Sequence, residues 1–252
     1  MSFAVDWLDL REDADNAARD SDLRDTAVTF IAAQRDPLVV DLGAGTGSTM
    51  RALKTAKAKW RLIDNDPALL AEAERRGGTI ETVEMDLTRV EAIPLDGSSL
   101  VTASALFDLA SRAWIDALAD RLAASRIGIY AALSYDGILQ WELADADDDA
   151  ARDAFNADQR TVKGFGPALG PDGASHLAEA MKIRGYAVNV APSPWRLGAA
   201  EAALQRSLLG GIAEAAARSG MANADEWLAR RLQSAETARC TVGHLDVLAL
   251  PS

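Results

Sequence analysis

The sequence predicts an α/β fold in which a largely parallel sheet is covered by helices on both faces. Short apolar runs that end in an acidic or small residue recur along the chain, with segments of helical composition between them. Three glycines at alternate positions, Gly43, Gly45 and Gly47, directly follow the first of these runs. A chain of 252 residues suffices for one such domain, so we expect residues 1–252 to form a single domain.

Composition excludes several classes of function. The chain has 26 Lys and Arg against 38 Asp and Glu, a net charge of −12, and such a surface repels nucleic acids and anionic lipids. Cys240 is the single cysteine, and His176 and His244 lie far apart, so we expect no disulfide and no metal site. The sequence has neither a secretory leader pattern nor an apolar run near ~20 residues, which predicts a cytoplasmic protein. We expect it to bind neither nucleic acid nor membrane, and the sequence leaves open whether it is a monomer or a dimer.

The first 36 residues have helical patterning, with apolar residues at helical spacing among many acids, and Pro37 ends the segment. It precedes the first strand, so it either caps a ligand site or forms a pair of packing helices.

The elements that follow alternate regularly. Asp66 at an N-cap position and Pro67 at the first helical position mark the start of one helix, and Gly77-Gly78 marks its end. The predicted strands are 38–42, 60–64, 79–85, 100–105, 126–133, 186–190 and 240–250. The predicted helices are 49–59, 68–76, 111–124, 174–183, 199–219 and 225–235.

Residues 141–175 interrupt this alternation directly after a core strand, which is long for a plain connection. The segment contains an acidic run, 145–149, then a short predicted helix and the glycine-proline loop 163–167. We interpret it as a lid or substrate-recognition insert and the acidic run as a solvated face.

The ends of the parallel strands should meet at one edge, where open α/β sheets bind ligands. Glycines there allow close backbone approach to a nucleotide-type cofactor, and the following helix offers free N–H groups. Asp64 suits a ribose diol, and Asp86 suits an adenine amino group. A dinucleotide-binding site would place a third glycine where Ser48 stands, so the spacing departs from that pattern.

The segments VVDLGAGTGS, RLIDNDP, MDLT and VTASALFDL, in this order, resemble the class I S-adenosylmethionine-dependent methyltransferase family. The resemblance implies a Rossmann-like, doubly wound sheet of seven strands, whose last strand is antiparallel and lies between the fifth and sixth. It also implies S-adenosylmethionine as cofactor and S-adenosylhomocysteine as product. The implied cofactor-binding residues are Asp41, Gly43, Ala44, Gly45, Gly47, Asp64, Asn65, Asp86, Leu87, Ala103 and Ser104, with Arg11 as a candidate partner of the cofactor carboxylate.

The predicted activity is methyl transfer to a small molecule by in-line displacement, which needs alignment and water exclusion more than a fixed catalytic set. Asp108 is the candidate base; alternatively it caps the next helix. The candidate substrate-pocket residues are Phe107, Tyr135, Trp141, Phe155, Asn156, Gln159, Lys163 and Phe165. An NAD(P)-dependent oxidoreductase and a non-catalytic S-adenosylmethionine-binding module are the alternatives.

Overall fold

The computed structural model describes residues 5–55, 57–77 and 80–252. The first four residues of the predicted N-terminal segment, together with Gly78 and Thr79 at the predicted helix stop and third strand, lie outside the described residues. Within the described part, the strands are β1 (Leu38–Leu42), β2 (Lys59–Asp64), β3 (Glu81–Glu84), β4 (Leu100–Ser104), β5 (Gly128–Trp141), β6 (Tyr186–Pro192), β7 (Trp195–Leu197) and β8 (Cys240–Pro251).

The helices of the described residues are α1 (Val5–Ala18), α2 (Ser21–Ala32), α3 (Ser48–Leu53), α4 (Pro67–Arg76), α5 (Arg112–Ser125), α6 (Asp148–Gln159), α7 (Gly173–Ile183), α8 (Ala202–Arg218) and α9 (Ala224–Ser234). Short 3₁₀ turns η1 to η4 cover Val90–Ala92, Phe107–Leu109, Gly170–Asp172 and Ala199–Glu201.

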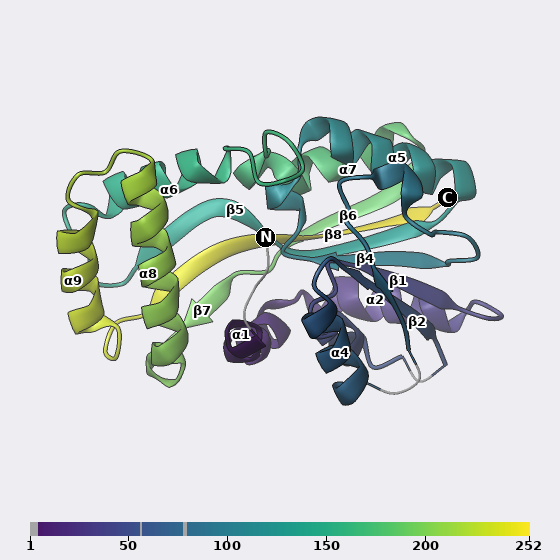
Figure 1. Ribbon diagram of the computed structural model, residues 1–252, viewed down its shortest axis with the longest axis horizontal. Helices are drawn as coiled ribbons and strands as arrows, with labels where there is room; N and C mark the ends of the chain where they lie inside the picture. The colour runs from purple at the N-terminus through teal and green to yellow at the C-terminus, as the bar shows by residue number, and fades with distance from the viewer. Residues whose placement is uncertain (1–4, 56, 78–79) are drawn as a thin grey trace.

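The strands form one sheet in the order β3-β2-β1-β4-β5-β8-β6, and β7 is an additional short strand that pairs with β8 (Figure 1). Neighbours from β3 to β5 pair in parallel, whereas β8 is antiparallel to both β5 and β6. The predicted α/β class and the antiparallel position of the last strand are therefore confirmed. The structure adds β7 to the predicted seven strands, and it extends β5 to Trp141, because β8 is long enough to pair with both.

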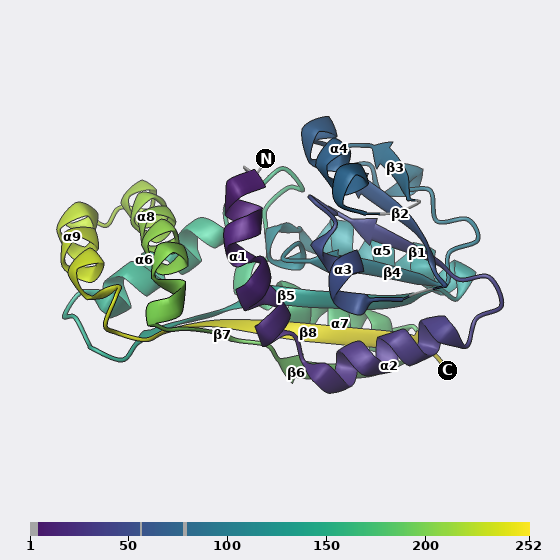
Figure 2. The same cartoon turned by 90° about the horizontal axis from the view of Figure 1, so that it is seen from below.

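Helices cover both faces of the sheet. Helices α5 and α7 lie on one face, and α2, α3 and α4 lie on the other (Figures 1 and 2). Each side has its own apolar core: Ile115 and Leu177 belong to the first, and Ile31 and Leu70 to the second. The N-terminal segment forms two helices with different positions. Its second helix, α2, is a packing helix, whereas α1 crosses the carboxyl edge of the sheet near the glycine turn (Figure 2).

The far ends of β5 and β8 extend beyond the main sheet and carry a separate helical layer of α6, α8 and α9 (Figure 1). A third apolar core holds this layer on the strands, with Trp227 and Ile212 fully buried in it. The predicted 141–175 insert supplies only α6 of this layer. The helices that complete it, α8 and α9, come from the segment after β7.

Two local predictions were wrong. The helix predicted over 49–59 ends at Leu53, because Lys54 adopts a left-handed conformation (φ 47°) that closes the last turn. The acidic run 145–149 is not simply a solvated face. Asp145 accepts hydrogen bonds from Arg230, and Asp148 accepts from Arg231 and from the indole of Trp227, so the run fastens α6 to α9.

Candidate functional site

The glycine turn after β1 is built as the sequence predicts. Gly43, Gly45 and Gly47 have φ values of 65°, 53° and 80°, in the left-handed region that residues with a Cβ rarely adopt. A Cβ added at Gly45 would lie 3.1 Å from Leu8 Cδ1, so α1 rests directly on this turn. The turn thus leaves the backbone open to a ligand from one side, and α1 covers it from another.

Asp64 ties the end of β2 to the glycine turn. Its Oδ2 accepts a hydrogen bond from the backbone N–H of Gly45 at 2.8 Å, and its Oδ1 accepts from the N–H of Asp66 at 3.0 Å. The side chain of Asp66 in turn caps α4 through the N–H of Ala68, as predicted. The carboxylate of Asp64 is therefore held in one orientation at the rim of a cavity.

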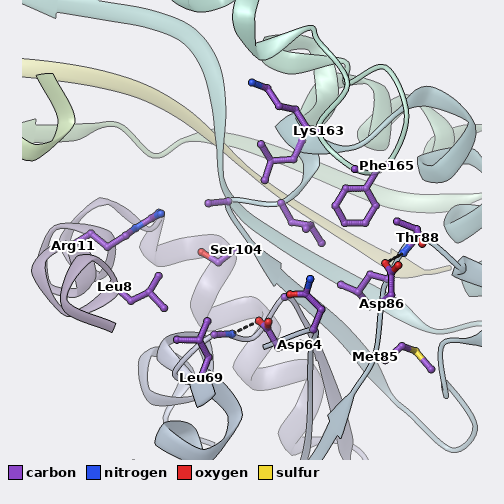
Figure 3. A pocket seen from close by; sticks show the side chains of 18 residues that line it. Leu8, Arg11, Asp64, Leu69, Met85, Asp86, Thr88, Ser104, Lys163 and Phe165 are labelled. Carbon is purple, nitrogen blue, oxygen red and sulfur yellow. Dashed lines mark hydrogen bonds between the residues drawn. The ribbon is translucent and has the colours of Figure 1, made fainter. Parts of the chain in front are cut away.

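That cavity, the cofactor cavity, has a volume of about 360 Å³, within the range of small-molecule sites. Figure 3 shows Leu8 and Arg11 of α1 on one side of it, Phe165 and Lys163 on the insert side, and Asp64 at the strand ends. Predicted residues that line it are Arg11, Gly43, Gly45, Asp64, Asn65, Asp86, Leu87, Ser104, Lys163 and Phe165. Residues that sequence reasoning missed are Leu8, Leu69, Met85, Thr88, Ala105, Leu106, Leu109 and Gly164.

Most of the missed residues are apolar, and three of them, Met85, Ala105 and Leu106, directly follow the ends of β3 and β4. For these three residues, position relative to the strand end was the available signal. Leu8 belongs to the N-terminal segment that was predicted either to cap a ligand site or to pack, and the sequence did not decide between the two.

Asp86 stands at the rim of the cofactor cavity with its carboxylate exposed. Its Oδ1 accepts a hydrogen bond from the N–H of Thr88 at 2.9 Å, and this bond lowers the pKa of Asp86. Asp86 is therefore an ionised acceptor close to the apolar side chains of Met85 and Leu87.

Beside the turn, a small cavity of about 50 Å³ is lined by Ala44, Arg11 and Ser104 among others. Arg11 forms an ion pair with Asp15 (Nε–Oδ2 2.9 Å), and Asp15 also accepts from the indole N–H of Trp195. Arg11 is therefore fixed at the boundary of the cavities.

The other predicted cofactor residues, Asp41, Gly47 and Ala103, line neither of these cavities. Asp41 is buried below the turn, where the hydroxyl of Thr102 donates to its Oδ1 at 2.7 Å. Burial raises the pKa of Asp41 to about 7, against the effects of the Thr102 bond and of the charge on Arg19. Arg19 is buried too, and its Nη2 donates to Ser104 Oγ at 3.2 Å.

An adjoining cavity of about 400 Å³, the acceptor cavity, lies between α1, α6 and α8. It shares Arg11, Ala105, Leu109 and Lys163 with the cofactor cavity. Of the predicted residues, Asp108, Phe155, Gln159 and Lys163 line it. Sequence reasoning missed Trp7, Asp158 and all the residues that α8 contributes, namely Ser207, Leu208, Gly211, Ile212, Ala215 and Arg218.

Four predicted substrate residues have structural contacts and line neither cavity. Phe107 is fully buried and packs against Trp114. The Tyr135 hydroxyl donates to Asn156 Oδ1 at 2.8 Å, and Asn156 Nδ2 donates to the carbonyl of Gly137, which joins α6 to β5. Trp141 contacts Trp227 in the third core.

Asp108 does not cap α5, because the hydroxyl of Ser111 does so by accepting from the N–H of Trp114. Only 8% of Asp108 is exposed, and within the described residues its Oδ1 accepts no hydrogen bond. Burial raises its pKa to about 6, and the charges of Arg11 and Lys163 act in the opposite direction. Asp108 is thus a buried, partly unsatisfied carboxyl group at the edge of the acceptor cavity.

In the described part of the chain, the remaining titratable residues form no metal site and no second cluster of reactive side chains. No group of His, Cys, Asp and Glu there is arranged to hold a metal ion. Cys240 is buried, which raises its pKa to about 12, and burial lowers the pKa of His244 to about 3. Among the described residues, no helix has the length and apolarity to cross a membrane.

The fold is similar to those of solved structures. The YcgJ protein of Bacillus subtilis matches with a TM-score of 0.53 and 12% identity, over 92% of this chain and 100% of that one. The plantazolicin methyltransferase BamL, in complex with a triazolic desmethylPZN analogue and SAH, matches with a TM-score of 0.50 and 13% identity, over 98% of this chain and 89% of that one. No family model and no curated protein matches the sequence. At these identities the likeness establishes the fold alone, which is that of the class I S-adenosylmethionine-dependent methyltransferases.

Proposed function

We propose that this protein is an S-adenosylmethionine-dependent methyltransferase that methylates a small molecule. The observation that carries the proposal is the pair of adjoining cavities at the carboxyl edge of the sheet, which share Arg11, Ala105, Leu109 and Lys163. Methyl transfer requires a donor and an acceptor side by side in a site that excludes bulk water. Two compartments with a common wall would hold the donor and the acceptor side by side.

The residues that line the cofactor cavity have the chemistry needed to bind S-adenosylmethionine. The fixed carboxylate of Asp64 suits the ribose hydroxyls, and Asp86 with Asn65 and Leu87 suits the adenine. The open backbone at Gly43 and Gly45, with Ala44, Ser104 and Arg11, suits the methionine end. In this proposal Asp41, Gly47 and Ala103 support the turn from below. The presence of SAH in the BamL structure supports the same cofactor.

When bound, S-adenosylmethionine supplies a methyl group on a positively charged sulfur, which departs as a neutral thioether. The chain's own part is to align the acceptor, exclude water and receive a proton. Asp108 is the proposed base, because its pKa of about 6 leaves it ionised at neutral pH yet more basic than an ordinary aspartate. Helix α1 and the loop that carries Phe165 cover the site.

Isothermal titration calorimetry with S-adenosylmethionine and S-adenosylhomocysteine tests the cofactor assignment. We expect saturable binding of both, and failure of both to bind would overturn the proposal. Replacing Asp64 by Ala removes charged hydrogen bonds, so affinity should fall by about 10- to 100-fold. Glu84→Ala is the matched control, because Glu84 is the exposed in-register neighbour of Asp64 on β3 and lines neither cavity.

Two further measurements separate the alternative functions. Enhanced NADH fluorescence on addition of the protein, without S-adenosylhomocysteine binding, would favour an oxidoreductase. Cofactor binding without methylation of any compound in a metabolite-pool screen would favour a non-catalytic binding module. We expect no NADH signal and at least one methylated product.

A further inference from the structure

The acceptor cavity has mainly apolar walls, which come from three separate helices. Trp7 of α1, Phe155 of α6, and Leu208 and Ile212 of α8 line it. Phe155 is held edge-on against Tyr135, with ring centroids 5.4 Å apart. Such walls favour a ligand with a compact apolar body, and aromatic side chains favour a ring that can pack against them.

Two adjacent glycines, Gly210 and Gly211, lie in the middle of α8. Glycine is among the least favourable residues in a helix interior. A Cβ added at either position would meet nothing within 4 Å, so close packing does not explain them. Gly211 lines the acceptor cavity, whereas Gly210 does not. The missing side chain at Gly211 therefore leaves part of the cavity free for a ligand.

Positive charge gathers on one wall of the same cavity, although the chain as a whole carries a net charge of −12. Lys163 Nζ lies 2.5 Å from Asp158 Oδ2, and Arg218 Nε lies 3.1 Å from Asp158 Oδ1. Two cations thus share one carboxylate. The ammonium group of Lys163 has three N–H donors, and one of them is used by Asp158. Arg218 binds Asp158 through Nε and Nη2, and more than half of its side chain is exposed.

We infer that the acceptor is a ring-bearing small molecule that carries a carboxylate. Its ring occupies the space beside Gly211, between the apolar side chains of α6 and α8. Its carboxylate is bound by Lys163 and Arg218, and with Arg11 the cavity lining carries three cations against the two carboxylates of Asp108 and Asp158. This inference rests on the proposed methyltransferase function, since it assigns the acceptor of that reaction.

The test uses one- and two-ring aromatic carboxylates, each paired with its own carboxamide, as probes of the full-length protein. Ligand-detected NMR and calorimetry measure their affinity with and without S-adenosylhomocysteine. We expect the carboxylates to bind saturably and the carboxamides to bind about tenfold more weakly, because the amide loses the charge-assisted contacts. Absence of saturable binding, or equal affinity within the pairs, would overturn the inference.

Two variants of α8 test whether the ring of the probe binds beside Gly211. Gly211→Leu places a side chain in the cavity and should abolish binding of both members of each pair. Gly210→Leu makes the same change one residue away, outside the cavity lining, and should leave both affinities unchanged. Circular dichroism and thermal unfolding check that both variants are folded. Equal effects of the two variants would contradict the assignment of the cavity.

A third variant locates the carboxylate. Lys163→Met keeps the length of the side chain and leaves Asp158 paired with Arg218, so no buried charge is orphaned. It should reduce the preference for carboxylate over carboxamide to nearly nothing, whereas Lys182→Met, at an exposed position of α7, should preserve it. If Lys163→Met still prefers carboxylate over carboxamide as strongly as the wild type does, Lys163 does not bind the carboxylate.

The same samples separate this inference from the proposed function. S-adenosylhomocysteine binding to the wild-type protein is measured independently of the probes. If that ligand fails to bind, the methyltransferase proposal falls. If it binds and the carboxylate probes do not, only the assignment of the acceptor falls.

Discussion

The cofactor cavity and the acceptor cavity adjoin each other, yet the structures around them are held together differently. Around the cofactor cavity, backbone groups predominate. The glycine turn requires left-handed φ values, and its N–H at Gly45 is bound by Asp64 at the end of the next strand. Gly45 and Asp64 lie within one strand–helix–strand unit of each other in the sequence, whereas α1, which covers the turn, is held by longer-range contacts such as the hydrogen bond from Trp195 to Asp15.

Around the acceptor cavity, side-chain contacts over long sequence separations predominate. Asp148 of α6 binds Arg231 of α9, Asp145 binds Arg230, and Asp158 binds Arg218 of α8. These pairs join the insert after β5 to the segment after β7. The acceptor side therefore depends on a few charged pairs that connect two separate parts of the chain.

The difference indicates that the two sides can change independently. Substitutions in α6, α8 or α9 alter the acceptor cavity without touching the glycine turn, because the third core is separate from the two cores of the main sheet. One fold can then keep its cofactor site while its acceptor varies. The following predictions test this independence, beginning with the largest expected effect.

Replacing Arg231 by Met should destabilise the helical layer by about 3 kcal/mol, the lower end of the cost of breaking a buried ion pair, because Asp148 keeps hydrogen bonds from the Trp227 indole and the Asp145 N–H. Arg231 is 3% exposed, donates to Asp148 Oδ1 at 2.8 Å and lies over the ring of Trp141. Urea unfolding followed by tryptophan fluorescence measures the loss. If the two sides are independent, S-adenosylhomocysteine affinity should change by less than about twofold under conditions where the main sheet stays folded.

Arg230 supplies the matched control. It is the next residue of α9 and binds Asp145 and Asp147, but it is exposed. Arg230→Met should therefore cost less than about 1 kcal/mol. Similar losses for the two variants, or a collapse of cofactor binding in Arg231→Met, would show that the two sides are coupled.

The same contrast explains how much the sequence could predict. Asp66 and Pro67 specify a helix start within a few residues, and Gly43, Gly45 and Gly47 specify a turn, so these features are visible locally. The fold class follows from such signals, whereas the strand order and most of the predicted cofactor-cavity lining came from the resemblance to the methyltransferase family. The error at α3 was local too, since helical composition alone did not reveal the left-handed Lys54.

On the acceptor side, the deciding contacts are tertiary. Aromatic residues such as Phe107 and Trp141 are typical of substrate pockets, but here both side chains pack in the apolar cores. The residues of α8 that line the cavity form no recognisable sequence motif. The role of Gly211 becomes apparent only when the structure places it in the same cavity as Phe155 and Trp7. Asp108 was identifiable because it follows a strand end, and only burial revealed its altered pKa.

Asp108 should make the protein less stable as the pH rises. Its pKa in the fold, about 6, lies above the ordinary value of 3.8, so the folded state binds the proton more tightly than the unfolded state. The stabilising contribution of the protonated form is complete below about pH 4 and is lost as the pH rises through about 6. Its size is on the order of 2–3 kcal/mol.

Asp108→Asn removes this dependence. Relative to wild type, the variant should gain on the order of 2 kcal/mol in free energy of unfolding between pH 4 and pH 8, measured by urea titration at each pH. Asp41 remains in the variant and titrates near 7, so some loss of stability toward higher pH persists. A constant difference between variant and wild type at all pH values would contradict the raised pKa of Asp108.

The smallest effect is expected at the glycine turn, where one methyl group tests how closely α1 is seated. Gly45→Ala forces a left-handed conformation on a residue with a Cβ, at about 1–2 kcal/mol, and its Cβ would lie 3.1 Å from Leu8 Cδ1. Gly97→Ala carries the same backbone strain (φ 75°) with nothing within 4 Å of the added Cβ. The two variants should therefore lose similar stability in thermal unfolding. Only Gly45→Ala should weaken S-adenosylhomocysteine binding in calorimetry, because only there does the added methyl group lie in the lining of the cofactor cavity and crowd Leu8 of α1. Binding of the carboxylate probes in the acceptor cavity should also weaken in Gly45→Ala, because Trp7 and Arg11 of α1 line that cavity. If only one of the two cavities loses affinity, α1 does not connect them.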